Sequence, residues 1–330
     1  MMRFLVVGWG SIGSRHGRNL VGLGHRVQVW DTDRDRLREA ATRPGIEAAA
    51  SLEGALAASP DAALICTPPA LHLEPARQAL AAGAHLFVEK PIAHASDGVP
   101  ALIEEARRRG RVLAVGFNLR FLPSLRRVKA LLEDKRVGAL FAVRAEFGAY
   151  LPDWRTGRDY RDNYAVCAAL GGGILLDAIH EFDYLGWLFG EATEVVCTAG
   201  HYSDLAGDTE DLAEVTLRFE SGLLGQVHLD YLQRHYRRSL QIIGAAGSIV
   251  WDFPTHAVTV YGTEPESMDT IHVDDGDVND MYVEEMRHFI RCLEGAESPL
   301  VDGNEALRST RLVEAAKRSA HERRRVQLSP

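Results

Sequence analysis

The sequence has few cysteines and no apolar stretch long enough to cross a membrane. The cysteines of the 330-residue chain are Cys66, Cys167, Cys197 and Cys292. No two of them have the spacing of a metal-binding motif, so we interpret them as free thiols and expect a cytoplasmic protein. A membrane-spanning helix needs roughly 20 consecutive apolar residues, and no such run is present. The chain begins MMRFLVVGWG, which is typical of a strand, so we expect no signal peptide.

An excess of positive charge is also missing, as are low-complexity segments and internal repeats. The chain has 37 Lys plus Arg against 46 Asp plus Glu, and its net charge is −9. This charge disfavours nucleic acid and anionic membrane surfaces as partners. Hydrophobic residues make up 46% of the chain, as is ordinary for a globular protein. The length is sufficient for two domains with cores of their own.

A glycine-rich turn follows the first apolar strand, Arg3–Val7, and precedes a helix expected over 14–23. It reads Gly8-Trp9-Gly10-Ser11-Ile12-Gly13. In such a turn Gly8 makes the sharp bend, Gly10 lets a pyrophosphate approach the backbone, and Gly13 lets helix and strand pack closely. The helix N-terminus, with Ser11 and Ile12, supplies free N–H groups for phosphates. The context therefore predicts a dinucleotide-binding loop.

A second strand, Arg26–Trp30, ends at Asp31, eighteen positions after Gly13. A carboxylate at this place accepts hydrogen bonds from the ribose hydroxyls of NAD and repels the extra phosphate of NADP. We therefore predict NAD as the cofactor. Arg34 and Arg36 follow closely and keep NADP possible. The alternative interpretation of Asp31 is a simple turn residue.

Strands and helices continue to alternate up to about residue 115, which predicts a doubly wound parallel sheet and an α/β fold. The expected strands are 62–66, 85–88 and 112–115, and the expected helices are 52–58, capped by Ser51, then 75–82 and 100–109. Ligands of such sheets bind beyond the carboxyl ends of the strands. The residues that we assign there to cofactor binding are Thr67, Pro68, His72, Glu89, Lys90 and Asn118, and those assigned to substrate binding are Lys90 and Arg120.

Lys90 is the most informative residue of this first half. It follows a strand end and precedes Pro91. A lysine there can reach a substrate hydroxyl beside the nicotinamide, and the cationic oxidised ring would lower its pKa into a useful range. The alternative is a solvated surface lysine, which is the commoner fate of this residue type.

The stretch 171–190 in the second half reads as one buried helix, because it is apolar on most sides. At helical spacing Asp177, His180 and Glu181 share one narrow face, with Asp183 at its edge. Buried charged groups need partners or a wet cleft. These residues are therefore either part of an active site or a buried Asp–His pair that hydrogen-bonds internally and has no catalytic role.

The rest of the second half is expected to form an antiparallel sheet with covering helices. Residues 150–170 are rich in aromatic and basic residues and read either as a loop that packs over a ligand or as a solvated loop. The ligand-binding candidates in this loop are Arg158, Tyr160 and Arg161. Strands are expected between 139 and 261, and helices over 124–132, 281–293 and 305–320. One face of this sheet would remain uncovered, and such faces often become oligomer interfaces.

Several of these motifs together resemble the glucose–fructose oxidoreductase / inositol dehydrogenase (Gfo/Idh/MocA) family over essentially the whole chain. They are GWGSIGSRH at residue 8, TPPALH at 67, EKP at 89, GFNLRF at 116 and GGGILLDAIHEFD at 171. The resemblance implies a Rossmann domain and a second α/β domain whose open sheet forms homodimers or homotetramers. It also implies that Lys90, Asp177 and His180 face the nicotinamide and that the Lys90–Pro91 bond is cis. The spacing of Asp177 and His180 is one residue shorter than usual for this family.

From these observations we expect residues 1–121 to form a Rossmann domain that binds NAD(P), and residues 122–330 to form a domain for substrate binding and assembly. The predicted activity is hydride transfer between the nicotinamide and a secondary alcohol or ketone of a sugar, cyclitol or acidic or nucleotide-activated sugar derivative. The catalytic candidates are Lys90, Asp177 and His180. Alternatives are a closed-cycle redox enzyme, such as an epimerase or NAD-assisted glycoside hydrolase, and a non-catalytic regulatory protein that binds NAD or a sugar.

Overall fold

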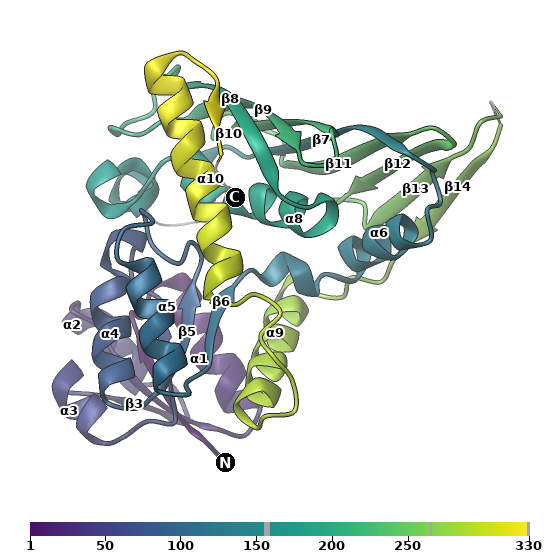
Figure 1. Ribbon diagram of the computed structural model, residues 1–330. Coiled ribbons are helices and arrows are strands. Elements are labelled where there is room, and N and C mark those ends of the chain that lie inside the picture. The colour runs from purple at the N-terminus through teal and green to yellow at the C-terminus, as the bar shows by residue number, and fades with distance from the viewer. Residues whose placement is uncertain (155–158, 265, 329–330) are drawn as a thin grey trace. The chain divides into compact units, whose positions relative to one another are not determined.

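The structure is a computed structural model that describes residues 1–154, 159–264 and 266–328. The chain divides into two compact units (Figure 1). Unit 1 comprises Met1–Asn118 and Val278–Thr310, and unit 2 comprises Leu119–Asp277 and Arg311–Pro330. The sequence predicts that everything after residue 121 belongs to the second domain, whereas the structure groups Val278–Thr310 with unit 1.

Unit 1 contains a six-stranded sheet with the strand order β3-β2-β1-β4-β5-β6. All five strand pairs are parallel. This order is that of a doubly wound dinucleotide-binding fold, so the predicted fold class of the first half is confirmed. The strands are β1 (Arg3–Val7), β2 (Arg26–Trp30), β3 (Ile46–Ala48), β4 (Ala62–Ile65), β5 (His85–Glu89) and β6 (Leu113–Gly116). The three-residue strand β3 was not predicted, because it is too short to show a pattern.

Helices cover both faces of this sheet. Helix α1 packs against α9, and α4 packs against α5 on the opposite face (Figure 1), as right-handed connections require. Ser51 caps α3 as expected, since its Oγ accepts a hydrogen bond of 3.0 Å from the N–H of Gly54. The α-helices of unit 1 are α1 (Ser11–Gly22), α2 (Arg34–Ala41), α3 (Leu52–Ala57), α4 (Leu73–Ala81), α5 (Val99–Arg108) and α9 (Val278–Leu293). A further helix, α10 (Gly303–Glu322), begins in unit 1 and ends in unit 2.

Unit 2 contains a nine-stranded sheet with the order β14-β13-β12-β11-β7-β10-β9-β8-β15. Seven of its pairs are antiparallel and β7 pairs with β10 in parallel. The mostly antiparallel sheet confirms the expectation from sequence. The strands are β7 (Leu140–Gly148), β8 (Ala192–Gly200), β9 (Leu212–Phe219), β10 (Leu224–Asp230), β11 (Arg237–Gly244), β12 (Gly247–Asp252), β13 (Ala257–Tyr261), β14 (Met268–His272) and β15 (Val326–Gln327).

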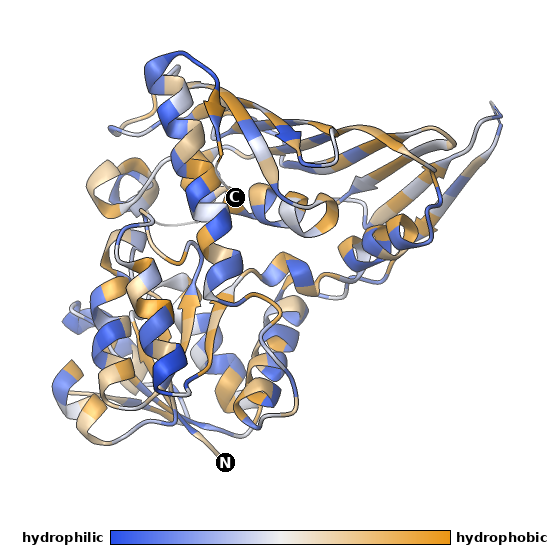
Figure 2. Cartoon of the chain, in the orientation of Figure 1, coloured by the Kyte–Doolittle hydropathy of each residue, from blue (hydrophilic) through white to orange (hydrophobic). Residues whose placement is uncertain are grey.

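One face of the nine-stranded sheet is apolar and covered by helices. Helix α6 (Pro123–Glu133) packs on β12 and β13, and the segment 174–189 packs on β7, β9 and β10. Along each strand buried apolar residues alternate with polar ones, so blue and orange alternate in Figure 2. The loop 151–170 forms short 3₁₀ turns where it is described. The polar face of the sheet carries none of these helices and is called the open face below.

The segment 171–190 is not one continuous helix, which corrects the prediction from sequence. Helix α7 (Ile174–Asp177) ends at Ala178, whose φ of −90° and ψ of 28° leave the helical region, and α8 (Ile179–Phe189) starts next. Asp177, His180 and Glu181 would share one narrow face only with unbroken helical spacing, and the break at Ala178 interrupts it. Asp177 belongs to the first helix and the other two residues to the second.

No helix within the described part of the chain combines the length and the apolar character needed to cross a membrane.

Candidate functional site

The glycine loop of unit 1 has the geometry that the sequence predicted. Gly8 has a φ of +97°, which favours glycine. A Cβ on Gly13 would lie 1.9 Å from the carbonyl oxygen of Gly8, so only glycine allows this close packing of helix and strand. A Cβ on Gly10 would meet nothing within 4 Å. Helix α1 starts at Ser11 and Ile12 without a side-chain cap, so its first N–H groups suit the phosphates of a dinucleotide.

Asp31 lies directly after β2 and is buried. Its Oδ2 accepts a 2.6 Å hydrogen bond from the N–H of Trp9, and its Oδ1 accepts one of 2.8 Å from the N–H of Asp33. The guanidinium of Arg36 lies 3.7 Å from Oδ2. Each carboxylate oxygen can accept a second bond. Asp31 therefore fixes the glycine loop and keeps acceptor capacity for ribose hydroxyls.

The segment after β4 is tied to the segment after β5 by His72. Its Nε2 lies 2.8 Å from the carbonyl oxygen of Thr67 and its Nδ1 lies 2.9 Å from that of Pro91. Burial lowers the pKa of His72, so the ring is neutral and donates through one nitrogen at a time. The Lys90–Pro91 bond is cis, as the family resemblance implied. His72 therefore connects the loop after β4 to the loop after β5. Pro68 precedes the 3₁₀ turn Pro69–Leu71.

Glu89 and Asn118 also use their side chains within unit 1. Glu89 Oε1 lies 2.6 Å from Nε2 of His16, and Oε2 accepts a hydrogen bond of 3.1 Å from the N–H of Lys90. Asn118 contacts the sulfur of Met281 at 3.1 Å. Both side chains are buried, whereas Lys90 is half-buried at the carboxyl end of the sheet. Among these residues Lys90 is thus the most exposed to an incoming ligand.

In unit 2 Asp177 is held by two tyrosines. It accepts hydrogen bonds of 2.7 Å from the hydroxyl of Tyr164 and 3.2 Å from that of Tyr231. His180 follows at the start of α8 and is 8% exposed. Burial, followed by the charge of Asp177, raises the pKa of Tyr231 well above its ordinary value, so this hydroxyl stays protonated and donates. The arrangement fixes the Asp177 carboxylate as an acceptor.

Two arginines of unit 2 form buried ion pairs with the other acidic residues of α8. Arg120 binds Asp183 in a bidentate pair with distances of 2.9 and 2.8 Å, and both side chains are almost fully buried. Arg238 binds Glu181 at 2.8 Å. Arg120 was expected to bind substrate, but in the structure its guanidinium forms an ion pair with Asp183. The geometry gives it a role in holding α8 in place.

The candidate ligand-binding loop is only partly described. Arg158 lies outside the described residues. Arg161 is exposed and forms an ion pair with Asp159, and this arginine lowers the pKa of Asp159 to about 2. The hydroxyl of Tyr160 accepts a hydrogen bond of 3.0 Å from the N–H of Ala206. Tyr160 therefore anchors the loop to the segment before β9.

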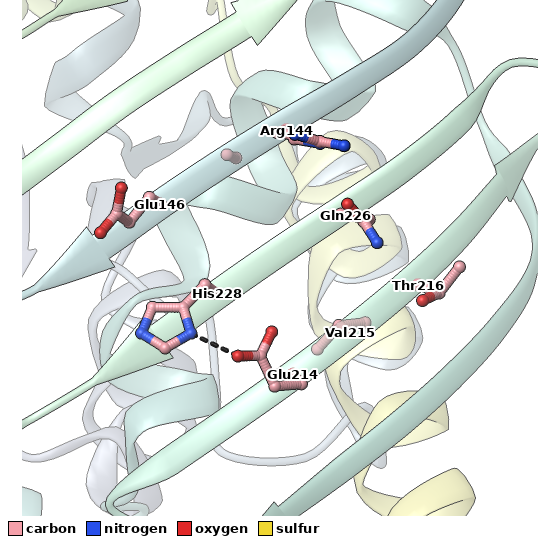
Figure 3. A pocket seen from close by; sticks show the side chains of 8 residues that line it. Arg144, Glu146, Glu214, Val215, Thr216, Gln226 and His228 are labelled. Atoms are coloured by element: carbon pink, nitrogen blue, oxygen red, sulfur yellow. Dashed lines mark hydrogen bonds and ion pairs between the residues drawn. The ribbon is translucent and has the colours of Figure 1, made fainter.

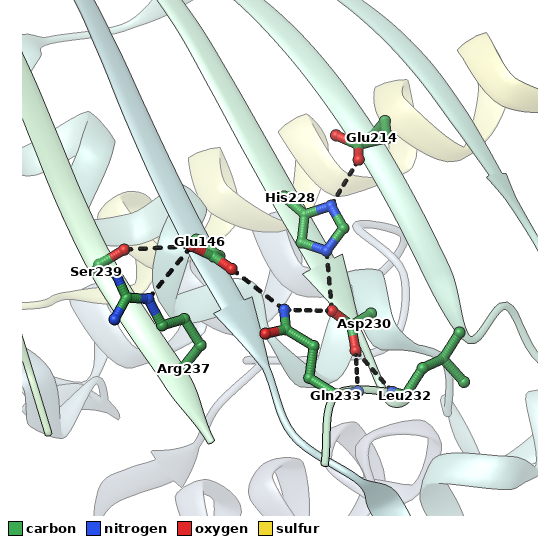
Figure 4. Close-up of polar contacts among 8 residues, drawn as sticks. All are labelled: Glu146, Glu214, His228, Asp230, Leu232, Gln233, Arg237 and Ser239. Carbon is green, nitrogen blue, oxygen red and sulfur yellow. Dashed lines mark hydrogen bonds and ion pairs between the residues drawn. The ribbon is translucent and has the colours of Figure 1, made fainter. Parts of the chain in front are cut away.

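A pocket of about 320 Å³ lies on the open face of the nine-stranded sheet (Figure 3). It is lined by residues of β7, β9 and β10, and these residues are Arg144, Ala145, Glu146, Glu214, Val215, Thr216, Gln226 and His228. At its edge His228 lies between two carboxylates, 2.6 Å from Glu214 and 2.9 Å from Asp230 (Figure 4). The hydrogen bond with Asp230, assisted by Glu214, raises the pKa of His228 to about 9. This imidazole is therefore a cation at neutral pH.

The charge of His228 predicts a pH dependence of stability. In the unfolded chain a histidine titrates near 6.5, so the stabilisation is fully present below about pH 6.5 and is lost as the pH rises through about 9. The ring is one-third exposed and therefore partly screened by solvent, so we expect its charge to contribute on the order of 1 kcal/mol to the free energy of unfolding. Urea unfolding of the native protein and of His228→Gln at pH 6 and pH 9.5 measures it. The difference in free energy of unfolding between the native protein and the variant should be smaller at pH 9.5 than at pH 6. An equal difference at both pH values would contradict a charged His228.

Some residues of these clusters were missed in the sequence. Tyr164 and Tyr231 are separated from Asp177 by 13 and 54 residues, so no local pattern links them. Glu285 could have been found, because it falls on the apolar side of α9 between Met281 and Phe289, where an acidic residue is out of place. Residue spacing alone did not indicate that Glu285 lies near His16 and Glu89.

Comparisons with family models match both halves of the chain. A model described as an oxidoreductase family with an NAD-binding Rossmann fold matches residues 2–117. A model of the GFO/IDH/MocA C-terminal domain matches residues 125–250. Together the two models extend over most of both units.

Individual proteins are similar along almost the whole chain. Myo-inositol 2-dehydrogenase of Thermotoga maritima is 31% identical over 99% of this chain and 98% of its own length. The crystal structure of GenD2 from gentamicin A biosynthesis with NAD is 26% identical, has a TM-score of 0.85 and covers 100% of this chain and 97% of its own. The WlbA dehydrogenase of Bordetella pertussis with NADH and UDP-GlcNAcA is 25% identical, has a TM-score of 0.86 and covers 100% of this chain and 99% of its own.

Proposed function

Because the chain belongs to the GFO/IDH/MocA family of oxidoreductases, we propose that this enzyme oxidises a secondary alcohol of a sugar, cyclitol or sugar derivative with NAD, or reduces the matching ketone. The observation that carries the proposal is the uncapped N-terminus of α1 beside Gly8, Gly10 and Gly13, with Asp31 after the next strand. Asp31 supports NAD as the preferred cofactor. Arg36 lies beside Asp31, so NADP remains a second possibility for the same loop.

The residues at this loop fit a dinucleotide. The free N–H groups of Ser11 and Ile12 bind the pyrophosphate, and the open space at Gly10 admits it. Asp31 accepts hydrogen bonds from the adenosine ribose. When NAD is bound, its nicotinamide supplies the acceptor for hydride. We assign the region near Thr67, Pro68 and Lys90 to the nicotinamide end, because these residues follow the carboxyl ends of β4 and β5.

Three side chains act on the substrate in this proposal. His180 removes the proton of the reacting hydroxyl as a general base, while the electron pair of the C–H bond leaves as hydride. The ammonium of Lys90 donates a hydrogen bond to the same oxygen, relays or shares the proton, and stabilises the negative charge that develops on the oxygen. Asp177, held by Tyr164 and Tyr231, accepts a hydrogen bond from the substrate and orients it. Positioning of this kind lowers the barrier by fixing the reacting atoms before the step.

The substrate class follows from the polar, aromatic character of these groups and from the relatives. The tyrosines and the carboxylate of Asp177 suit a ligand with several hydroxyl groups. Similar proteins are named for myo-inositol and 1,5-anhydro-D-fructose, and one was crystallised with the acidic nucleotide sugar UDP-GlcNAcA. Arg161, together with Arg158, is the candidate to bind an acidic group of the substrate.

The test is the appearance of NADH when the purified protein is incubated with NAD and a panel of cyclitols, aldoses, uronic acids and nucleotide sugars. We expect absorbance of reduced nicotinamide with one class of substrate. A protein that binds NAD but reduces it with none of them would contradict the proposal. Analysis of the products and of the cofactor's redox state would then distinguish a closed-cycle enzyme from a regulatory protein.

We also propose that the open face of the nine-stranded sheet mediates a homodimer or homotetramer. Scattered exposed apolar residues on this face support it, and they are Val196, Leu224, Tyr261 and Met268. Sedimentation that shows only a monomer at micromolar concentration would contradict it. A cytoplasmic location is proposed as well, supported by the four free cysteines, and cell fractionation tests it.

A further inference from the structure

Three titratable side chains meet inside unit 1, and one of them is the residue before Lys90. They are His16 on α1, Glu89 at the end of β5 and Glu285 on α9. One ring nitrogen or carboxylate oxygen of each lies within 4.8 Å of those of the others. Their exposed fractions are 0%, 7% and 2%, so the cluster is shielded from solvent. The role of this cluster is not explained by the assignments above.

Glu285 is the unusual member of the cluster. Neither of its carboxyl oxygens has a hydrogen-bond partner among the described residues, although both are buried. An ionised carboxylate without partners is very costly in such surroundings. Burial and the charge of Glu89 raise the pKa of Glu285 well above its ordinary value. The thiol of Cys66 faces the same region, and burial together with Glu89 and Glu285 raises its pKa as well.

The distances distinguish a shared proton from a metal ion. Two ligands that each lie about 2.0–2.1 Å from a tetrahedral zinc ion are roughly 3.3 Å apart. His16 Nε2 and Glu89 Oε1 are only 2.6 Å apart, which is the length of a charge-assisted hydrogen bond. A proton therefore fits between them better than a metal does.

We propose that His16, Glu89 and Glu285 form a buried proton-sharing cluster in which Glu285 is a neutral carboxylic acid that donates to Glu89, and that this cluster positions Lys90. The gap of at most 4.8 Å is within reach of a side-chain rotation or of one bridging water. The part that concerns Lys90 rests on the function proposed for that residue. Glu285 and His16 are positioning residues in this scheme.

The cluster acts on Lys90 through Glu89. The Glu89 carboxylate receives one hydrogen bond from His16 and one from the backbone N–H of Lys90. A third from Glu285 would fix both its charge and its orientation. Glu89 would then be a rigid anchor for the residue that follows it, in the way that outer partners orient ligands and catalytic groups.

The protonation state is tested by infrared spectroscopy of the full-length protein. We expect a carbonyl stretch of a protonated carboxylic acid at pH 7 that shifts in D₂O and is missing in Glu285→Gln. Glu284→Gln is the matched control, because Glu284 is the neighbouring residue on α9 and forms ion pairs with Arg287 and Arg291. The band should persist in this control. A Glu285→Gln spectrum that keeps the band would overturn the proposal, and so would a stoichiometric metal ion that this variant loses.

The effect on Lys90 is tested by comparing Glu285→Gln with Glu285→Leu. Glutamine keeps a neutral donor, so we expect a kcat within about twofold of the native enzyme. Leucine packs with the apolar side of α9 but donates nothing to Glu89, so we expect kcat to fall about 10- to 100-fold with an altered pH profile. Equal kcat values in both variants would overturn the positioning role. If no substrate is turned over, the infrared result still decides the protonation of Glu285 separately from the proposed activity.

Discussion

Replacing Lys90 with alanine is expected to lower kcat by about 10²- to 10⁴-fold, because a positioned acid or base commonly contributes that much. The dissociation constant for NAD should change little, since the glycine loop and Asp31 are untouched. Steady-state rates of NADH formation measure the first quantity, and a titration of bound NAD measures the second. The chain must also keep its melting temperature, which is checked by calorimetry.

Two variants sharpen this experiment. Lys129→Ala removes a lysine that pairs with Glu133 on α6, so it should leave the rate unchanged. Lys90→Arg keeps the positive charge but does not release a proton near neutral pH. If Lys90 acts only through its charge, the arginine variant keeps much of the rate, whereas a relayed proton requires lysine itself. Normal turnover of the alanine variant would remove Lys90 from the mechanism.

Replacing Arg120 with methionine is expected to reduce the free energy of unfolding by about 3–5 kcal/mol, because Asp183 would lose the cation that offsets its burial. For a protein unit of this size the loss corresponds to a fall of roughly 6–20 °C in Tm. Urea unfolding followed by tryptophan fluorescence measures it, since Arg120 lies 5.6 Å from the ring of Trp187.

Two control variants separate the effect of leaving one buried charge unpaired from the effect of losing an ion pair as such. Arg107→Met removes an exposed partner of Glu104 and should leave the urea midpoint almost unchanged, because solvent screens this pair. The double variant Arg120→Met with Asp183→Leu removes both buried charges and should recover most of the stability. A variant at Arg120 that keeps its Tm but raises KM would instead support the substrate role expected from the sequence.

The regular part of the fold was predictable because local patterns determine it. Strand β1, the glycine turn and α1 follow each other as the motif requires, although α1 starts at Ser11 rather than at residue 14. The break at Ala178 was not predictable, because nothing in the apolar pattern of 174–189 marks it. The same holds for strand β15, which pairs with β8 from more than a hundred residues away.

Candidate site residues could be predicted where their own position after a strand end identifies them. They could not be predicted where the role depends on contacts with distant segments of the chain. Lys90 and Asp31 are examples of the first kind. Arg120 was expected to bind substrate because it follows a strand end, and spacing could not reveal its partner Asp183, which lies 63 residues away. His72 was expected to contact cofactor, yet its ring contacts the carbonyl groups of Thr67 and Pro91. The residue types and their positions after strand ends marked Arg120 and His72 as candidate functional residues. Only the packed structure shows which groups their side chains contact.

The carboxylate of Asp31 links the choice of cofactor to the integrity of the loop. Exchanging it for a small neutral residue is the obvious route toward NADP, because the repulsion of the extra phosphate would vanish. The same exchange leaves the N–H of Trp9 without its acceptor, which costs about 1–3 kcal/mol if the group stays buried. Asparagine offers one carbonyl oxygen where two amides now bind separate oxygens. A lineage or an engineer that changes the coenzyme must therefore rebuild the turn at Trp9 in the same step.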